Sequence, residues 1–282
     1  MKILIIGRFH PKNASGLIKI AKYLNYNIKY GSVNDIPNSD IIFIPDNVLD
    51  TTKFDNNKKF IFGPHLSVFP DKRLYLINNT NKNSIYIQPS EWAKQVWIHI
   101  NNIIPLKVFY FPVNTEKFKP ITNNERKKVF IYFKRRKNEE LNVITSFLNN
   151  KNIEYKIFDY IKRYDEEDYL NYLQNSKYGI ILGAHESQGF AIEEALSCDV
   201  PLLVWNVTSM NQEEGINYPD IQATSIPYWD NRCGEYFYDT NEFESKYEEF
   251  INKLDTYKPR EYVSENLSVE KCSNNFNNII NF

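Results

Sequence analysis

Two carboxylates and a glycine lie close together in one short segment of the chain. Glu186 falls in a predicted loop, Gly189 follows it, Phe190 begins a predicted helix, and Glu194 comes seven intervening residues after Glu186. Glycine lets a backbone approach a ligand closely, and the free N–H groups at a helix start suit phosphate or sugar oxygens. The carboxylates can accept hydrogen bonds from sugar or ribose hydroxyls. Spacing alone equally allows Glu186 to cap the helix and Glu193 and Glu194 to decorate its first turn.

A run of basic residues follows an apolar segment, at Lys134-Arg135-Arg136-Lys137. Alternate side chains of an extended chain share one face, so we expect Lys134 and Arg136 to point the same way. Two cations there can neutralise charge that builds up on a departing phosphate. In a chain with 34 lysines and arginines, a solvated basic turn is the other interpretation.

Short apolar runs alternate with longer amphipathic stretches around these residues. Strands are predicted at 2–6, 40–44, 60–62, 84–87 and 107–111, and again at 128–133, 155–158, 178–182 and 201–205. Helices are predicted after Gly16, after Ser90, and at 139–148, 166–174, 190–197, 242–254 and 268–280. The proline-containing, polar stretch 112–124 is predicted to be a linker between the two halves.

This alternation predicts an α/β fold with two Rossmann-like, doubly wound domains that face each other across a cleft. We expect one domain at 1–113 and a second at 114–282, with the last helix packing back on the first domain. Ligands of such sheets bind beyond the carboxyl ends of the strands. Glu186 and Lys134 both follow predicted strands, so they are expected at that edge.

Composition excludes several classes of protein. Lys and Arg number 34 and Asp and Glu 35, so the chain lacks the basic character of a nucleic-acid-binding protein. No apolar run approaches the roughly 20 residues of a membrane helix, and the first residues lack the apolar segment of a signal peptide. Three scattered cysteines indicate neither a disulfide framework nor a zinc site. We therefore expect a cytoplasmic protein without a transmembrane segment.

The segment around the two glutamates resembles the E-x7-E motif of family-4 retaining glycosyltransferases, which have the two-domain GT-B fold. Their pattern is roughly E-x-x-G-F-x-x-x-E-A-x-A-x-G-x-P. Gly189-Phe190, Glu194-Ala195 and Pro201 match it, whereas Asp199 replaces a glycine. Residues 113–120 are similar to the family's G-V-D-x-x-x-F-x-P, but the glycine is missing and Asn114 stands in place of aspartate. The resemblance covers roughly residues 113–205.

The resemblance implies roles for five residues of the matched segment. Glu186 would contact the donor sugar near its reacting carbon, and Glu194 would bind the ribose hydroxyls of the nucleotide. Backbone groups of Gln188, Gly189 and Phe190 would hold sugar hydroxyls or phosphate.

Further candidates come from other parts of the family pattern. The family's cations on the donor diphosphate correspond to Lys134 and Arg136, and Tyr160 lies in the turn that usually binds the base. His65 would line the site near the sugar's hydroxyls, and Gly16 partly matches paired glycines near the donor phosphates. A surface tyrosine is an equally good interpretation of Tyr160.

These expectations combine into a metal-independent, retaining glycosyltransferase of the hexosyltransferase type. It would move a sugar from a UDP- or GDP-linked donor to a glycan or other hydroxyl acceptor, with no cofactor and no nucleic-acid partner. No D-x-D metal motif follows a predicted strand. The alternatives are a sugar-nucleotide epimerase of the same fold and a catalytically silent protein that binds nucleotide sugars.

Overall fold

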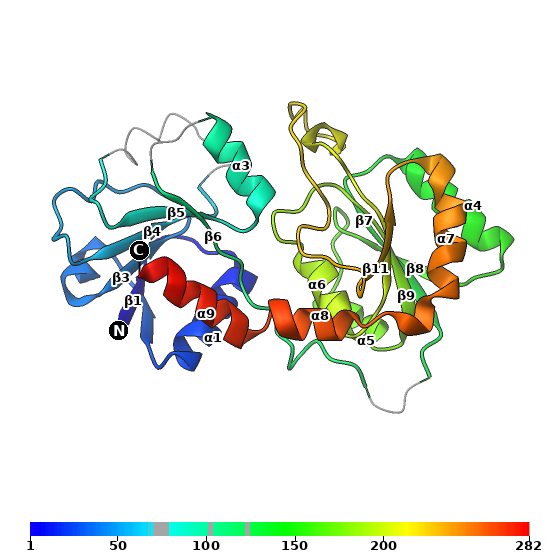
Figure 1. Cartoon of the computed structure of the whole chain (residues 1–282), viewed down its shortest axis with the longest axis horizontal. Coiled ribbons are helices and arrows are strands. Elements are labelled where there is room, and N and C mark those ends of the chain that lie inside the picture. Colours follow the sequence, from blue (N-terminus) through cyan, green and yellow to red (C-terminus); the bar gives the residue numbers. More distant parts are fainter. Residues whose placement is uncertain (67, 70–78, 101–103, 122–124, 282) are drawn as a thin grey trace. The chain divides into compact units, whose positions relative to one another are not determined.

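The computed structural model describes residues 1–66, 68–69, 79–100, 104–121 and 125–281, and it divides the chain into two compact units. Unit 1 combines Met1–Pro112 with Leu267–Phe282, and unit 2 is Val113–Asn266. Each unit is built on one sheet, and all the strand pairings recorded in the described residues of the two sheets are parallel (Figure 1). Within the described residues, no helix combines the length and apolarity needed to cross a membrane.

Unit 1 holds a sheet with the strand order β2-β1-β3-β4-β5-β6. Its strands are β1 (Lys2–Ile5), β2 (Asn27–Tyr30), β3 (Ile41–Ile44), β4 (Lys59–Phe62), β5 (Ser84–Gln88) and β6 (Leu106–Val108). Its helices are α1 (Pro11–Tyr23), the short η1 (Val33–Asn38), α3 (Glu91–Ile100) and α9 (Val269–Ile280). All residues of β3 and β5 are buried, which is typical of parallel strands covered on both faces.

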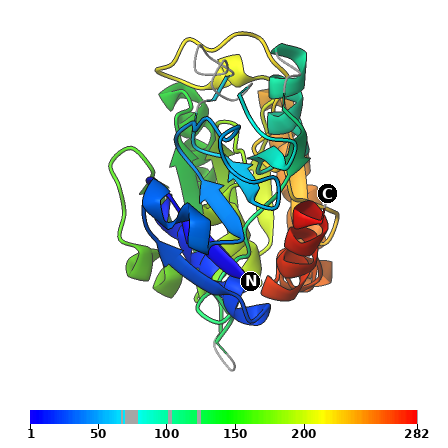
Figure 2. The same cartoon turned by 90° about the vertical axis from the view of Figure 1, so that its left-hand side faces the viewer.

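Helix α9, near the end of the chain, is part of unit 1 and contacts residues of its amino-terminal segment. The Tyr26 hydroxyl donates to Asn277 Oδ1 at 3.3 Å, and Lys59 Nζ donates to the carbonyl oxygen of Ile280. Both views show the two chain ends on this unit (Figures 1 and 2). Unit 1 is therefore assembled from two segments that are distant in sequence.

Helix α1 begins earlier than the sequence predicted. It starts at Pro11, a favoured first helical residue because proline's missing N–H has no helical partner there. Gly16, predicted to end a loop, is instead a buried residue inside the helix. An added Cβ at this position would lie 3.0 Å from Pro112 Cδ and 3.1 Å from Phe111 Cβ. Gly16 thus allows close packing of α1, and the loop after β1 ends at His10.

Unit 2 holds a sheet with the strand order β11-β10-β9-β7-β8. Its strands are β7 (Lys128–Lys134), β8 (Tyr155–Asp159), β9 (Ser176–Gly183), β10 (Leu202–Trp205) and β11 (Gly234–Phe237). Its α-helices are α4 (Asn138–Asn150), α5 (Glu166–Leu173), α6 (Phe190–Ser197), α7 (Phe243–Asn252) and α8 (Pro259–Asn266). The short helices η2 (Met210–Gln212), η3 (Thr240–Glu242) and η4 (Leu254–Thr256) complete it.

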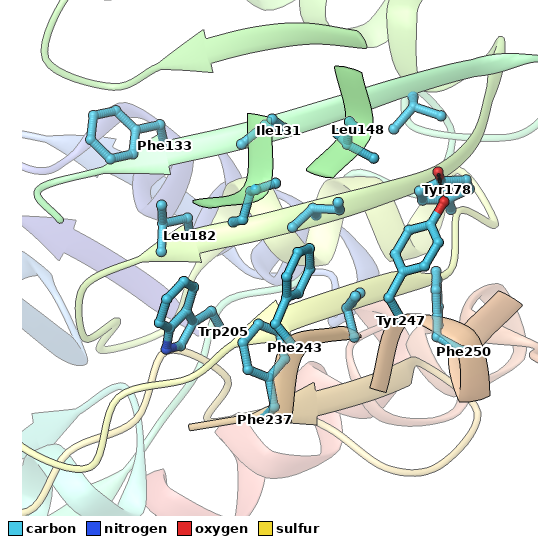
Figure 3. Close-up of a cluster of buried hydrophobic side chains, with 14 of the residues drawn as sticks. Ile131, Phe133, Leu148, Tyr178, Leu182, Trp205, Phe237, Phe243, Tyr247 and Phe250 are labelled. Carbon is cyan, nitrogen blue, oxygen red and sulfur yellow. Dashed lines mark hydrogen bonds between the residues drawn. The ribbon is translucent and has the colours of Figure 1, made fainter. Parts of the chain in front are cut away.

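An aromatic core fixes the central strands of this sheet (Figure 3). Side chains of β7, β9 and β10 meet rings from α7 there, among them Phe243, Tyr247 and Phe250. The hydroxyls of Tyr178 and Tyr247 are 2.7 Å apart, so these two buried polar atoms bond to each other. Because this core holds the strands in place, the loops that follow their carboxyl ends begin at fixed positions.

Most of the predicted elements are confirmed within one to three residues at each end, including α6 at Phe190–Ser197. Strands β2 and β11 and helix α8 were not predicted. The proposed linker is packed on unit 2 over its described part, because Val113 and Phe118 are buried and Lys117 pairs with Glu166 at 2.7 Å. Residues 122–124 of that stretch lie outside the described residues.

Candidate functional site

The carboxyl ends of adjacent strands bring Lys134 and Glu186 together in unit 2. Lys134 ends β7 and pairs in register with Gly183, the last residue of β9. Lys134 Nζ donates to Glu186 Oε1 at 2.7 Å, and the two side chains are 16% and 13% exposed. The same ammonium lies 4.6 Å from the centre of the Tyr160 ring, which follows β8. Three predicted site residues from three loops therefore share one location.

Lys134 is a fixed positive charge. Burial acts to lower its pKa, but the Glu186 carboxylate, with Tyr160 and Glu213, outweighs burial and raises the pKa above its ordinary value. The ammonium is therefore charged at neutral pH. A charged, desolvated amine at a strand end can neutralise negative charge on a ligand without first reorganising water.

Gly189 connects the Glu186 loop to helix α6. Its φ of +93° is left-handed, a conformation that glycine adopts without steric cost. An added Cβ would lie 3.4 Å from Glu186 Cβ. The preceding loop is also fixed by a backbone hydrogen bond, because the N–H of Glu186 donates to Thr224 O at 3.0 Å. The start of α6, at Phe190, is thus held next to Glu186.

The first turns of α6 carry two buried glutamates. Glu194 is 4% exposed, and it acts together with burial to raise the pKa values of Tyr164 and Tyr169. Glu193 is 1% exposed and accepts a hydrogen bond at 3.0 Å from Nε2 of Gln188, which is also buried. The sequence singled out Gln188 and Glu194 but gave Glu193 no role beyond helix decoration. In the structure, Glu193 anchors the side chain of Gln188.

The second expected cation, Arg136, does not share a face with Lys134. Arg135 between them has a left-handed φ of +49°, which ends the alternation of the extended strand. The Arg136 guanidinium is buried, with Nη2 2.5 Å from Glu140 Oε1 and Nη1 3.2 Å from the carbonyl oxygens of both Gly183 and Trp205. Arg136 therefore ties the ends of β9 and β10 to α4, and the expectation of a shared face was wrong.

Glu213 is a further buried carboxylate near Lys134 that was not predicted from the sequence. It lies after η2, and its side chain is 6% exposed. Glu213 Oε1 is 2.5 Å from Arg135 Nη1, and Oε2 is 3.3 Å from His185 Nδ1. Burial lowers the pKa of His185, whereas Glu213 acts to raise it. Glu213 therefore links Arg135 and His185, the neighbours of Lys134 and Glu186 in the chain. Because these contacts join loops that are distant in sequence, no local sequence pattern predicts them.

A cavity of about 370 Å³ lies around the end of β8. Its lining combines aromatic, aliphatic, polar and charged side chains: Phe133, Asn138, Leu141, Lys156, Ile157, Phe158, Asp159, Lys162, Arg163, Tyr164 and Asp168. Tyr160, the residue expected to stack on a base, is 44% exposed in the same turn. A planar ring with polar edges matches this mixture of apolar and charged side chains.

Asp199 departs from the family pattern in residue type but keeps the backbone conformation of a glycine. Its φ is +61°, a left-handed value that aspartate tolerates better than most residues. Asp199 Oδ1 accepts from the backbone N–H of Arg260 at 3.2 Å. The Arg260 and Arg126 side chains donate to carbonyl oxygens at the end of α6. Cations at a helix carboxyl end are favourable, so this end of α6 is firmly held.

His65 lies in unit 1, at the carboxyl edge of that unit's sheet. It follows β4, and its backbone N–H donates to Pro45 O at 2.7 Å. His65 Nε2 is 3.1 Å from Asn13 Nδ2, and the ring lies edge-on to Phe9 with centroids 5.6 Å apart. Partial burial of the ring, followed by the neighbouring His10, lowers the pKa of His65 to about 4, although the residue as a whole is exposed. His65 is therefore a neutral imidazole at physiological pH.

Two parallel α/β units with charged residues gathered past the strand ends define a Rossmann-like, GT-B architecture. Solved structures match the chain over nearly its whole length. The apo form of the lipopolysaccharide outer core galactosyltransferase WaaB has a TM-score of 0.60 at 13% identity and covers 99% of both chains. The catalytic domain of starch synthase IV from Arabidopsis thaliana, bound to ADP and acarbose, has a TM-score of 0.61 at 9% identity. That match covers 99% of this chain and 98% of the starch synthase chain.

A mutant of TarM from S. aureus, in complex with Fondaparinux, alpha-GlcNAc-glycerol and UDP, has a TM-score of 0.55 at 15% identity. That match covers 93% of this chain and 58% of TarM. At these identities the comparisons show the fold, and the GT-B prediction is confirmed. No family model and no curated protein matches the chain.

Proposed function

We propose that this protein is a metal-independent, retaining glycosyltransferase that moves a sugar from a UDP- or GDP-linked donor to a hydroxyl of a glycan or another acceptor. The carrying observation is the desolvated Lys134–Glu186 pair at the strand ends, beside the start of α6. Starch synthase IV with ADP and TarM with UDP support a nucleotide ligand for this fold. The family-4 resemblance of the Glu186–Glu194 segment supports the retaining outcome.

In the proposed reaction, the bond between the sugar's anomeric carbon and the donor phosphate oxygen breaks. The acceptor oxygen bonds to the same face of that carbon, and the departing diphosphate takes the acceptor's proton. Lys134 stabilises the negative charge on the diphosphate, because its ammonium is charged and shielded from water. Glu186 stabilises the positive charge that develops at the anomeric carbon.

The nucleotide would lie along the loops that follow β8 and β9. Glu194 would bind ribose hydroxyls, and Tyr160 with the cavity at β8 would hold the base. Backbone groups of Gln188, Gly189 and Phe190 would hold sugar or phosphate oxygens, since the anchored Gln188 and the left-handed Gly189 fix that turn. The start of α6 favours an anion through its oriented N–H groups.

Two of the remaining predicted residues, Arg136 and Gly16, receive revised roles. Arg136 orders the strand ends rather than touching the diphosphate, since its guanidinium is committed to Glu140 and two carbonyls. Gly16 acts through packing of α1. His65 would line the site near the sugar's hydroxyls, as the family resemblance implies.

Calorimetry with UDP-, GDP- and ADP-linked sugars tests the proposal directly. We expect the wild-type chain to bind at least one donor and Glu194→Ala to bind it more weakly. Absence of binding across the panel contradicts the proposed function. An NMR assay with donor alone separates the reactions, because an epimerase converts the sugar without an acceptor whereas a transferase leaves it unchanged.

A further inference from the structure

Arg135 has a backbone conformation that arginine adopts only at a cost in free energy. Its φ is +49°, in the left-handed region, where the close approach of Cβ to a carbonyl oxygen destabilises an L residue by about 1–2 kcal/mol. Such a conformation persists only where the surrounding structure enforces it, and it is frequent at functional sites. Arg135 lies between Lys134 and Arg136, so its conformation sets the directions of both neighbours.

Two hydrogen bonds from one short segment hold Arg135 in this conformation. The backbone N–H of Glu214 donates to the carbonyl oxygen of Arg135 at 2.8 Å. The Arg135 guanidinium donates through Nη1 to Glu213 Oε1 at 2.5 Å, and the Glu213 side chain is only 6% exposed. The backbone and the side chain of Arg135 are therefore both fixed by residues 213–214.

Glu213 is itself well supported and contacts a second loop. It follows η2, and its backbone N–H donates to the carbonyl oxygen of the buried Met210 at 3.2 Å. Its other carboxylate oxygen, Oε2, lies 3.3 Å from Nδ1 of His185, the residue before Glu186. The carboxylate thus bonds to the turn after β7 and lies against the loop after β9.

Stability alone does not account for this arrangement. Burial of the Glu213 carboxylate carries a desolvation penalty, and the left-handed Arg135 adds backbone strain. A leucine at 213 with a glycine at 135 would avoid both costs. What the arrangement provides is a fixed turn directly after Lys134, where the geometry of the candidate site is set.

We propose that Glu213 is a positioning residue that holds the left-handed turn at Arg135 and thereby directs the Lys134 ammonium toward Glu186. In this arrangement Lys134 Nζ lies 2.7 Å from Glu186 Oε1. Glu213 acts through Arg135 and does not contact the donor. The inference rests on the proposed function only for the reaction that Lys134 assists.

A rescue experiment in the full chain tests the role of the turn. We expect Glu213→Leu to lower kcat about a hundredfold, since a displacement of about 1 Å in a catalytic group can have that effect. Because glycine adopts a left-handed φ without strain, Glu213→Leu/Arg135→Gly should regain a kcat within about fivefold of the wild type. A folded double variant that stays as slow as Glu213→Leu overturns the proposal.

The matched control is Glu213→Leu/Asn152→Gly. Asn152 is exposed and has a left-handed φ of +55° in the same unit, at the turn between α4 and β8. Its replacement relieves left-handed strain away from Lys134, so kcat should stay as low as in Glu213→Leu. Recovery in this control would show that general stabilisation restores activity, and it would contradict a specific role for the Arg135 turn.

Nitrogen NMR of the lysine side chains follows Lys134 without any ligand, with its signal assigned by loss in Lys134→Met. We expect a distinct, hydrogen-bonded ammonium signal in the wild type, its loss in Glu213→Leu and its return in Glu213→Leu/Arg135→Gly. Glu213→Gln should keep the signal and most of the wild-type kcat, because an amide oxygen still accepts from Arg135. An unchanged signal in Glu213→Leu, or a glutamine variant as impaired as the leucine variant, contradicts the positioning role. If Glu213→Leu does not fold, the double variant and Glu213→Gln decide by the same criteria.

The outcomes distinguish the inference from the proposed function. If the wild-type chain binds no donor and transfers no sugar, the proposed function fails, while NMR still decides whether Glu213 holds Lys134 in place. If Glu213→Leu transfers sugar at the wild-type rate, the positioning role is refuted even though the transferase assignment stands.

Discussion

Replacing Lys134 with methionine removes the cation of the candidate site while keeping most of the side chain's length. The variant leaves Glu186, 13% exposed, without the ammonium that lies 2.7 Å away. Breaking a fully buried ion pair costs about 3–5 kcal/mol. Because both partners retain slight exposure, we expect Lys134→Met to lower the free energy of unfolding by about 2–3 kcal/mol, measured by urea denaturation.

Activity should fall further than stability explains. Loss of one preorganised group that stabilises transition-state charge typically costs about 10²–10³ in kcat. The double variant Lys134→Met/Glu186→Leu should regain stability, because an apolar pair can replace a buried ion pair, yet it should remain inactive. Transfer is measured at saturating donor, at a temperature where each variant is fully folded.

The control is Lys127→Met, which removes a 72% exposed lysine that lies 2.9 Å from Glu125, outside the cavity at β8. Exposed pairs contribute little, so its kcat should match that of the wild type. A kcat for Lys134→Met within tenfold of wild type would refute the role of Lys134 on the diphosphate. The raised pKa of Lys134 sets the sign of the pH effect. The contribution of the pair to stability is complete below the unfolded lysine pKa of about 10.4 and is lost as the pH rises through the higher pKa of the folded state.

Three other variants test neighbouring parts of the site. Gly189→Ala places an L residue at φ +93°, so we expect about 1–2 kcal/mol lower unfolding free energy and weaker diphosphate binding by calorimetry; unchanged values would mean that the turn needs no glycine. Glu194→Ala should weaken nucleoside diphosphate binding about tenfold, and wild-type affinity would remove Glu194 from the site. Arg136→Ala removes the guanidinium that pairs with Glu140 and should lower the unfolding free energy by about 3 kcal/mol. A variant of wild-type stability without activity would instead indicate that Arg136 contacts the donor diphosphate.

The fold was largely predictable because buried parallel strands are continuous apolar runs. Strand β2 escaped detection since Asn27–Tyr30 is a short edge strand with mostly exposed residues. The start of α1 was misplaced because Gly16 was interpreted as part of a loop, although Pro11 carried a usable helix-start signal.

The candidate site was predictable where its residues are adjacent in sequence, as in the Glu186–Glu194 segment. The pairing of Lys134 with Glu186 follows from parallel strands whose ends meet at one edge. The role of Arg136 was missed because a single left-handed residue, Arg135, redirects the chain, and basic residues leave no local sign of such a turn. The contacts of Glu213 with Arg135 and His185 join distant loops, which local patterns do not encode.

The split composition of unit 1 has a consequence for biosynthesis. Phe109 packs against Phe276 of α9, with ring centroids 5.5 Å apart. On the ribosome, this partner emerges only after all of Val113–Asn266 has been translated. The continuous second unit can close while the first still exposes an apolar surface, which is when nascent chains are prone to aggregate. The order in which the two units mature is then the reverse of the order in which they begin to emerge.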